Sequence, residues 1–191
     1  MISVKEAKKI ISENVSLLEP VTLQLQESAG LILTEDVYSS MDIPAFPQSS
    51  MDGYAFSFEG WKQHKKLKIT GEVAAGSNET FTLAPGNAVR IFTGAAVPAG
   101  ADTVIMQEKT QVENGELKIE DETLQQGNSV RLKGSEIKAG ELALGKESVL
   151  SPSAIGFLAG IGIKEIKAYP NPSISVIITG NELQQPGQSL Q

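Results

Sequence analysis

The sequence predicts a mixed α+β protein with more than one domain. Three sequence patterns indicate this: an amphipathic helical pattern at the N-terminus, short alternating apolar runs between turn residues from about 42 to 140, and an unbroken apolar run, ISVII, near the end. Helical spacing, strand alternation and continuous apolar character each need a different packing partner. We therefore expect helices, a β-rich unit and the start of an α/β sheet within one chain.

The composition excludes several functional classes. The chain has 191 residues, a net charge of −7 and no cysteine, which excludes disulfides and thiolate metal sites and allows a reducing compartment. The basic stretch at 62–68 is short and aromatic residues make up 5%, so a nucleic-acid interface is not expected. No apolar run approaches the ~20 residues of a membrane span, and the first residues lack the apolar core of a secretory signal. We expect a cytoplasmic protein that binds neither membrane nor nucleic acid.

The N-terminal segment is predicted to form a helix over residues 4–17. Ser3 and Glu6 match a capping box, apolar residues follow at helical spacing, and Pro20 ends the pattern. Alternating apolar residues then predict a short strand over 21–25. The segment 27–35 resembles a second short helix.

The central part of the chain is predicted to form a small β barrel or sandwich. Its clearest element is a hairpin over 110–119, where Asn114-Gly115 suits the positive φ angles of a type I′ turn. Many short strands at regular spacing are typical of such folds. Further strands are expected at 67–69, 88–91, 103–106 and 130–132.

The last part of the chain combines a helix with two apolar segments. Ser151-Pro152 is a helix start, and a strand is expected at 163–168. The run Ile174–Ile178 is typical of a strand covered on both faces, as in a parallel sheet. Too few residues follow to complete such a sheet, so we expect a truncated α/β domain. The alternative that this run completes an earlier sheet beside 163–168 remains open.

Four loops combine glycine with hydroxyl and carboxylate side chains, at 49–54, 91–102, 131–137 and 179–183. Glycine lets the backbone approach a ligand closely, and a carboxylate can take a proton or hold Mg²⁺. Each loop alone also fits a tight structural turn. Glu182 stands apart because it follows an expected parallel strand, where ligands of α/β sheets bind.

Taken in order, these loops carry four specific strings: DIPAFPQSSMDGYA (42–55), VRIFTGAAVPAGADTVIMQE (89–108), VRLKGSEIKAGE (130–141) and ITGNELQQPG (178–187). Together they resemble the MoeA-type molybdopterin molybdotransferases, a family that includes part of gephyrin. The combination of SxMDGYA with TGAxxPxGADTVxxQE is specific to that family. The resemblance covers essentially the whole chain but only about half of a normal family member.

The resemblance implies an elongated, multi-domain fold. Residues 1–43 with 142–170 would form a discontinuous α+β domain I, and residues 44–141 an inserted β-rich, barrel-like domain II. Residues 171–191 would begin a truncated α/β domain III that binds molybdopterin. Family members form homodimers whose active site lies between the α/β domain of one subunit and the inserted β domain of the other.

The resemblance also implies a reaction. Adenylylated molybdopterin and molybdate would give molybdenum cofactor and AMP, supported by Mg²⁺, and the molybdopterin adenylyltransferase is an expected partner. The matching positions assign catalytic roles to Asp52, Thr93 and Glu182, with Asp52 and Glu182 also expected to bind the metal. Expected substrate-binding residues are Ser50, Gly94 and Glu136, the last standing where the family more often has Asp.

Charge restricts these roles further. Molybdate and the substrate's phosphates are anions, which Asp52 and Glu182 would repel if they bound them directly. The two carboxylates fit better as Mg²⁺ ligands, partners of pterin N–H groups or acid–base groups. Thr93 with the amides near Gly94 suits a polar substrate atom. Cationic residues for molybdate are expected outside this chain, which is therefore expected to be inactive alone. A non-catalytic dimerisation or scaffold module and a sugar- or nucleotide-binding β protein remain alternatives.

Overall fold

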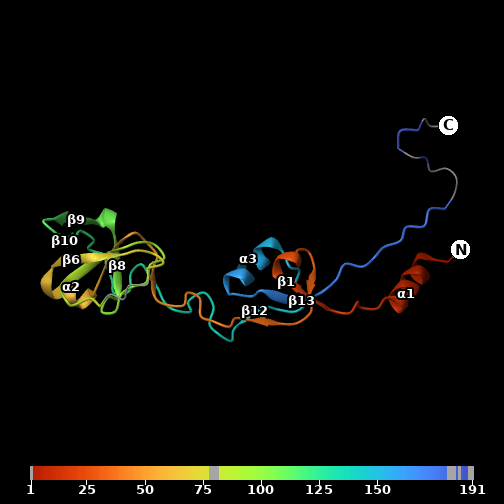
Figure 1. Ribbon diagram of the computed structural model, residues 1–191, viewed down its shortest axis with the longest axis horizontal. Coiled ribbons are helices and arrows are strands. Elements are labelled where there is room, and N and C mark those ends of the chain that lie inside the picture. Colours follow the sequence, from red (N-terminus) through yellow and green to blue (C-terminus); the bar gives the residue numbers. More distant parts are fainter. Residues whose placement is uncertain (1, 78–81, 180–183, 185, 189–191) are drawn as a thin grey trace.

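The computed structural model describes residues 2–77, 82–179, 184 and 186–188. Figure 1 shows an elongated chain with two packed lobes, joined by two chain segments that run side by side. We call residues 47–131 the β lobe and residues 21–39 with 141–169 the mixed lobe. Helix α1 (Val4–Asn14) and the last described residues extend beyond the mixed lobe (Figure 1). The predicted mixed α+β class is confirmed.

The mixed lobe is built on a three-stranded antiparallel sheet in the order β1-β13-β2. Its strands are β1 (Val21–Gln24), β2 (Ile32–Leu33) and β13 (Glu165–Tyr169). The lobe also contains a two-stranded pair, β3 (Val37–Tyr38) with β12 (Leu142–Leu144), and helix α3 (Pro152–Gly160). As predicted, Ser151 caps α3 by accepting a hydrogen bond from the Ala154 amide. The lobe has its own buried apolar core, formed by Leu25, Leu31, Leu33, Leu150, Leu158, Ile161, Ile166 and Ala168, together with Ile137 from the segment that joins the lobes.

The predicted helix over 27–35 is wrong. A short 3₁₀ helix, η1 (Leu25–Glu27), is followed by Gly30 at φ +80° and then by β2. Gly30 adopts the left-handed conformation that stops a helix, and Leu33 is fully buried against β13 and the chain at Ser148. Long-range pairing and burial of the leucines therefore override the local helical pattern.

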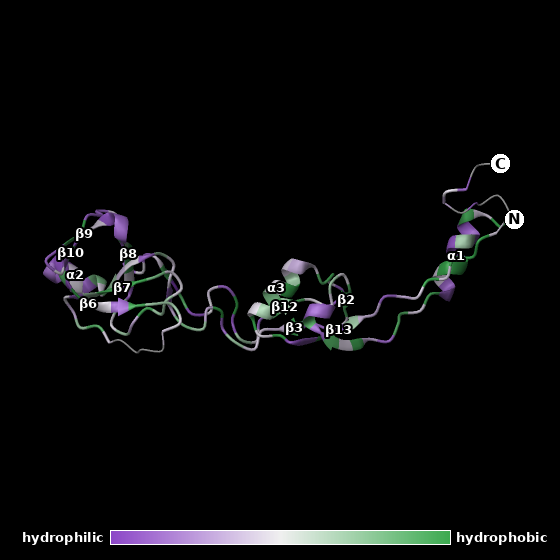
Figure 2. Cartoon of the chain, turned by 45° about the horizontal axis from the view of Figure 1, so that its top comes forward, coloured by the Kyte–Doolittle hydropathy of each residue, from purple (hydrophilic) through white to green (hydrophobic). Residues whose placement is uncertain are grey.

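Helix α1 confirms the predicted capping box but ends three residues earlier than expected, since the prediction ran to residue 17. The Ser3 hydroxyl accepts from the Glu6 amide at 3.2 Å, and the Glu6 carboxylate accepts from the Ser3 amide at 2.8 Å. None of its residues is buried, although Figure 2 shows that several of them are apolar, and Val4, Ile10 and Ile11 are exposed. Its stability within the described residues therefore depends on local interactions.

The apolar run Ile174–Ile178 is not part of a strand in the structure, and Ile174, Val176 and Ile177 are more than four-fifths exposed. The alternative that it completes the sheet beside β13 is wrong, because β1 and β2 occupy both edges of β13. A strand needs a neighbour with free backbone groups. Within the described residues, this run pairs with no strand.

The β lobe contains a curled six-stranded sheet in the order β8-β5-β7-β6-β10-β9, which confirms the predicted β-rich unit. The strands are β5 (Gly53–Phe56), β6 (Lys66–Val73), β7 (Asn87–Ile91), β8 (Thr103–Met106), β9 (Thr110–Glu113) and β10 (Glu116–Ile119). Asn114 and Gly115 have φ angles of 52° and 79°, as the predicted hairpin turn requires. A separate pair, β4 (Gln48–Ser49) with β11 (Val130–Arg131), flanks the sheet.

Two short helical elements of the β lobe are absent from the sequence prediction: α2 (Phe58–His64) and the 3₁₀ helix η2 (Gln107–Lys109). The Ser57 hydroxyl caps α2 by accepting from the Gly60 amide, and the Asp102 carboxylate accepts from the Phe58 amide at 2.9 Å. The second contact spans 44 residues and so has no local signal. Among the described residues, no helix has the length and apolar character needed to cross a membrane.

Candidate functional site

Asp52 and Thr93 are in direct contact at one edge of the β-lobe sheet. The Asp52 Oδ1 atom accepts a hydrogen bond from the Thr93 amide at 2.8 Å and another from the Thr93 hydroxyl at 2.7 Å. Strand β5 runs antiparallel to β7 with Gly53 opposite Ile91, so the residues before β5 and after β7 leave the sheet at the same edge. Both side chains are exposed. The fold thus joins two of the sequence-predicted site residues at the surface.

Gly53 explains why Asp52 can occupy this position. Strand β5 lies between β7 and β8, and a Cβ atom at position 53 would lie 1.8 Å from the carbonyl oxygen of Ile105. Only glycine therefore allows β8 to approach β5 this closely. The Gln107 amide, at the end of β8, donates to the Asp52 carbonyl at 3.2 Å. The backbone of Asp52 is held in place by the strand beside it.

Ser50 and Gly94 lie in the same loop region as Asp52 and Thr93. The Ser49 amide donates to the Ala95 carbonyl at 2.9 Å, and the Gly94 amide donates to the Ser49 carbonyl at 2.8 Å. Gly94 has φ +83°, a conformation that favours glycine. The two loops that carry the predicted site residues are therefore bound to each other through their backbones.

The hydrogen bonds between the two loops change the role expected for the amides near Gly94. The amides of Thr93, Gly94 and Ala95 all donate within the protein, to Asp52, Ser49 and Phe92. They are not available to a substrate atom, contrary to the role expected for the amides near Gly94. Within the described residues, two side-chain groups of these loops have no hydrogen-bond partner in the protein: Asp52 Oδ2 and the Ser50 hydroxyl. Both groups are therefore free to bind a ligand.

Asp52 is held as a carboxylate. The Thr93 amide, followed by the Thr93 hydroxyl, lowers the pKa of Asp52 below its ordinary value, and the positive charge of Arg90 lowers it further. Hydrogen bonds donated to the charged form favour that form. Near neutral pH the Asp52 carboxylate therefore accepts hydrogen bonds or binds a cation, and it is a poor proton donor.

Replacing Thr93 with valine is expected to raise the pKa of Asp52 toward its ordinary value. Valine keeps the shape of threonine but removes the hydroxyl that donates to Oδ1 at 2.7 Å. Titration of the Asp52 carboxyl carbon by NMR measures the shift. The matched control is Thr123→Val, because Thr123 donates in the same two ways to Asp121, whose pKa lies at about 2. That variant should raise the Asp121 pKa alone; equal effects on Asp52 would contradict the assigned contact.

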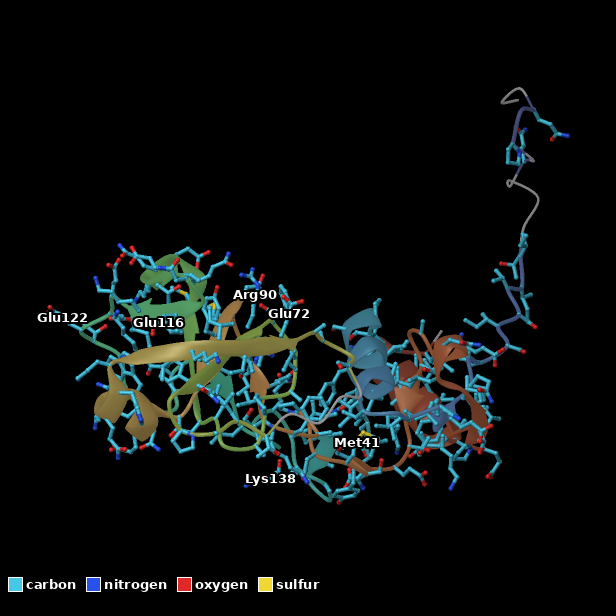
Figure 3. The ribbon with its side chains drawn as sticks, turned by 60° about the vertical axis from the view of Figure 1, so that its left-hand side comes forward. Met41, Glu72, Arg90, Glu116, Glu122 and Lys138 are labelled. Atoms are coloured by element: carbon cyan, nitrogen blue, oxygen red, sulfur yellow. The ribbon has the colours of Figure 1, made fainter. Side chains whose placement is uncertain are left out.

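Arg90 and Gln107 belong to this region, and neither is among the residues predicted from the sequence. The Arg90 guanidinium donates to Gln107 Oε1 at 3.0 Å, and its carbon lies 5.3 Å from the centre of the Phe92 ring. Figure 3 shows Arg90 at the surface of the β lobe beside Glu72. The available signal was an arginine within the apolar strand AVRI. Alternation alone did not show which residues lie next to it.

Glu136 has no hydrogen bond or ion pair with Asp52 or Thr93. Glu136 forms an ion pair with Arg131 at 3.3 Å, and its amide donates to the Ile43 carbonyl in the segment that joins the lobes. Glu182 lies outside the described residues, so its predicted place near Asp52 has no structural test. Within the described part of the chain, no three carboxylate or histidine groups gather as metal ligands would. This part supplies Asp52 as a single exposed ligand.

A pocket of about 520 Å³ lies in a different part of the molecule. Its lining comes from the segment after α1 (15–18), the turn into β2 (30–32), Glu147 and the residues that follow β13 (169–172), and it is mostly apolar. Among the described residues, none of the predicted site residues lines it. We place the candidate site at Asp52 and Thr93, because polar groups that can orient a ligand converge there.

Comparison with known proteins decides the family. The model of the MoeA N-terminal region (domain I and II) matches residues 2–162. The chain belongs to the MoeA family. The Asp52–Thr93 pair thus joins two loops within the region that this MoeA model describes.

Individual MoeA relatives match along the whole chain. A molybdopterin molybdenumtransferase of Nostoc sp. strain PCC 7120 is 38% identical over 200 residues, covering 100% of this chain and 46% of the relative. A molybdopterin molybdenumtransferase 2 of Mycobacterium tuberculosis strain H37Rv is 32% identical over 196 residues, covering 100% of this chain and 48% of the relative. The chain thus spans about half the length of the curated MoeA relatives it matches.

Solved MoeA structures show the same fold. A molybdopterin biosynthesis MoeA protein from Pyrococcus horikoshii OT3 aligns with a TM-score of 0.84 and 29% identity, over 98% of this chain and 51% of that one. A second Pyrococcus structure aligns with a TM-score of 0.77 and 32% identity, over 100% of this chain and 50% of that one. The predicted resemblance to the MoeA family is confirmed.

Proposed function

We propose that the whole protein containing this chain is a molybdopterin molybdotransferase of molybdenum cofactor biosynthesis. It would transfer molybdenum from molybdate to adenylylated molybdopterin and release AMP. The observation that carries this proposal is the contact between Asp52 and Thr93, made by two loops from distant parts of a MoeA-family chain. The names of the relatives, molybdopterin molybdenumtransferases, support the choice of substrate.

The proposed roles follow from charge and hydrogen bonding. Asp52 is ionised and its Oδ2 atom faces no protein donor in the described residues, so it can accept from a pterin N–H group. Thr93 orients that carboxylate through Oδ1. The Ser50 hydroxyl, adjacent to this pair, can donate to a polar substrate atom. Gly94 gives the loop its shape through a positive φ angle, and Glu136, paired with Arg131, would contact the substrate at the edge of the site.

A magnesium ion fits this donor set as a shared ligand. Mg²⁺ is usually bound by one or two carboxylates together with substrate phosphates, so it needs no cluster of protein carboxylates. Asp52 Oδ2 and Glu182 would provide the protein oxygens. When bound, the ion would neutralise negative charge on the substrate's phosphates. Asp52 then contributes to binding an anionic substrate although its own charge repels anions.

We also propose the domain division that the family resemblance implies: residues 1–43 with 142–170, residues 44–141, and residues 171–191. The separate apolar cores of the two lobes support it, since the β-lobe core contains buried residues from 54 to 124 only. Ile137 packs in the core of the mixed lobe, so residues near the C-terminal boundary of the inserted domain also contact domain I. We further propose a cytoplasmic homodimer with its active site between subunits, supplied by the molybdopterin adenylyltransferase.

The decisive experiment is a molybdenum-insertion assay with the full-length protein. Purified protein, adenylylated molybdopterin, molybdate and Mg²⁺ should release AMP and produce cofactor that activates a molybdenum-free apoenzyme. Omitting molybdate, or using molybdopterin without the adenylyl group, should abolish AMP release. Residues 1–191 alone should give no turnover. A full-length protein that binds no adenylylated molybdopterin and releases no AMP would instead support the scaffold alternative.

A further inference from the structure

Arg90 lies in the sheet next to the loop that carries Asp52, and Gln107 contacts both residues: its amide donates to the Asp52 carbonyl and its Oε1 atom accepts from Arg90. On β7, Arg90 stands opposite Tyr54 of β5 and opposite Glu72 of β6. Asp52 immediately precedes β5, two residues before Tyr54. The positive charge of Arg90 also lowers the pKa of Asp52. A cation therefore lies within electrostatic reach of the candidate site.

The guanidinium of Arg90 has few strong partners. It makes one good hydrogen bond, to Gln107 Oε1 at 3.0 Å. Its contacts with the Tyr54 hydroxyl at 3.5 Å and the Glu72 carboxylate at 3.8 Å are long and weak. A guanidinium carries five N–H donors, and this side chain is 36% exposed. Most of its donors therefore remain available to a ligand.

Aromatic rings hold this cation in a defined place. The guanidinium carbon lies 5.3 Å from the Phe92 ring centre and 5.9 Å from the Tyr54 ring centre. Aromatic rings attract a cation and restrict the arginine side chain. Ligand binding therefore costs little additional side-chain entropy. Such an arginine is suited to bind a planar or tetrahedral oxyanion through two parallel hydrogen bonds.

The charges around Arg90 leave it only partly neutralised. The acidic groups on the surrounding elements are Glu72 on β6, Asp52 before β5 and Glu108 in η2. Glu108 accepts a hydrogen bond from the Gln107 side chain. Among them only Glu72 is within ion-pair distance, and a pair of that length with an exposed partner contributes little. A ligand phosphate would replace this weak pairing with close charge-assisted hydrogen bonds.

We propose that Arg90 binds a phosphate group of the pterin substrate at the Asp52–Thr93 site. This inference rests on the proposed function and deepens it, because it places a substrate-binding cation within this chain. Asp52 and Arg90 then have different roles. The Asp52 carboxylate accepts hydrogen bonds from N–H groups or binds a metal ion, and the Arg90 guanidinium binds phosphate oxygens. A purely structural Arg90 would serve only to hold Gln107 and η2.

Titration calorimetry of the full-length protein with adenylylated molybdopterin tests the proposal. Arg90→Gln should weaken binding roughly 10- to 100-fold, since a hydrogen-bonded charge on the ligand is lost. Arg90→Lys should recover part of that loss. Glu72→Gln removes the competing carboxylate and should tighten binding by about threefold. The matched control, Lys66→Gln, removes another ion-paired cation from the opposite end of β6 and should leave binding unchanged.

The outcomes separate this inference from the proposed function. If the wild-type protein binds adenylylated molybdopterin and Arg90→Gln binds within twofold of it, the Arg90 assignment is wrong and the proposed function stands. If the wild-type protein does not bind adenylylated molybdopterin, both the Arg90 assignment and the proposed function are wrong. A structural role for Arg90 would lower the melting temperature in Arg90→Gln and would give no tighter binding in Glu72→Gln. Tighter binding in Glu72→Gln with an unchanged melting temperature supports the direct contact.

Discussion

Asp52→Asn in the full-length protein is expected to reduce molybdenum insertion by about 100-fold or more and to leave the fold intact. The Thr93 amide and hydroxyl donate to Asp52 Oδ1 at 2.8 and 2.7 Å. Asparagine has the same shape, and its Oδ1 atom can still accept both hydrogen bonds. The substitution removes the negative charge and replaces the free Oδ2 acceptor with an NH₂ donor. Both proposed roles of that oxygen, binding Mg²⁺ and accepting from a pterin N–H group, would be lost.

Molybdate-dependent AMP release measures the effect of Asp52→Asn, and thermal unfolding checks the fold. Asp121→Asn is a matched control, because Asp121 accepts from Thr123 as Asp52 does from Thr93 but belongs to none of the four family loops. The control should retain activity. Activity of Asp52→Asn within a few-fold of wild type would count against a catalytic site at Asp52 and favour a scaffold.

Gly53→Ala is expected to destabilise the β lobe by roughly 3 kcal/mol or more, because it forces an atom into a closely packed sheet. The new Cβ would lie 1.8 Å from the Ile105 carbonyl oxygen and 3.1 Å from the Met106 Cα atom. These are backbone atoms, so a side-chain rotation cannot relieve the overlap. Strand β8 would have to separate from β5, which would also remove the Gln107 amide from the Asp52 carbonyl.

Urea unfolding of the 191-residue chain, followed by the fluorescence of Trp61 in the β lobe, measures the effect of Gly53→Ala. Gly156→Ala serves as the control, because Gly156 lies in α3 with no atom within 4 Å of an added Cβ. Alanine suits a helix better than glycine does, and α3 belongs to the mixed lobe, so the midpoint reported by Trp61 should not fall in this variant. A Gly53→Ala midpoint equal to that of wild type would show that β5 and β8 are not packed as described.

Elements with a local signal could be predicted well. The capping box of α1 involves residues three positions apart, the β9–β10 turn depends on Asn114-Gly115, and α3 begins at Ser151-Pro152. The segment 27–35 had a helical pattern as well, yet β13 and the mixed-lobe core made it a turn and a strand. Local patterns failed there because burial and strand pairing stabilise more than helix propensity does.

The sequence by itself determined the family and the loops that matter, because short strings such as SSMDGYA and TGAAVP specify both residue type and spacing. Only the tertiary structure decided how these loops meet. The contact between Asp52 and Thr93 spans 41 residues, and the place of Arg90 depends on its register against Tyr54 and Glu72. Register follows from packing across the whole sheet, where a shift of one residue would turn Arg90 to the opposite face.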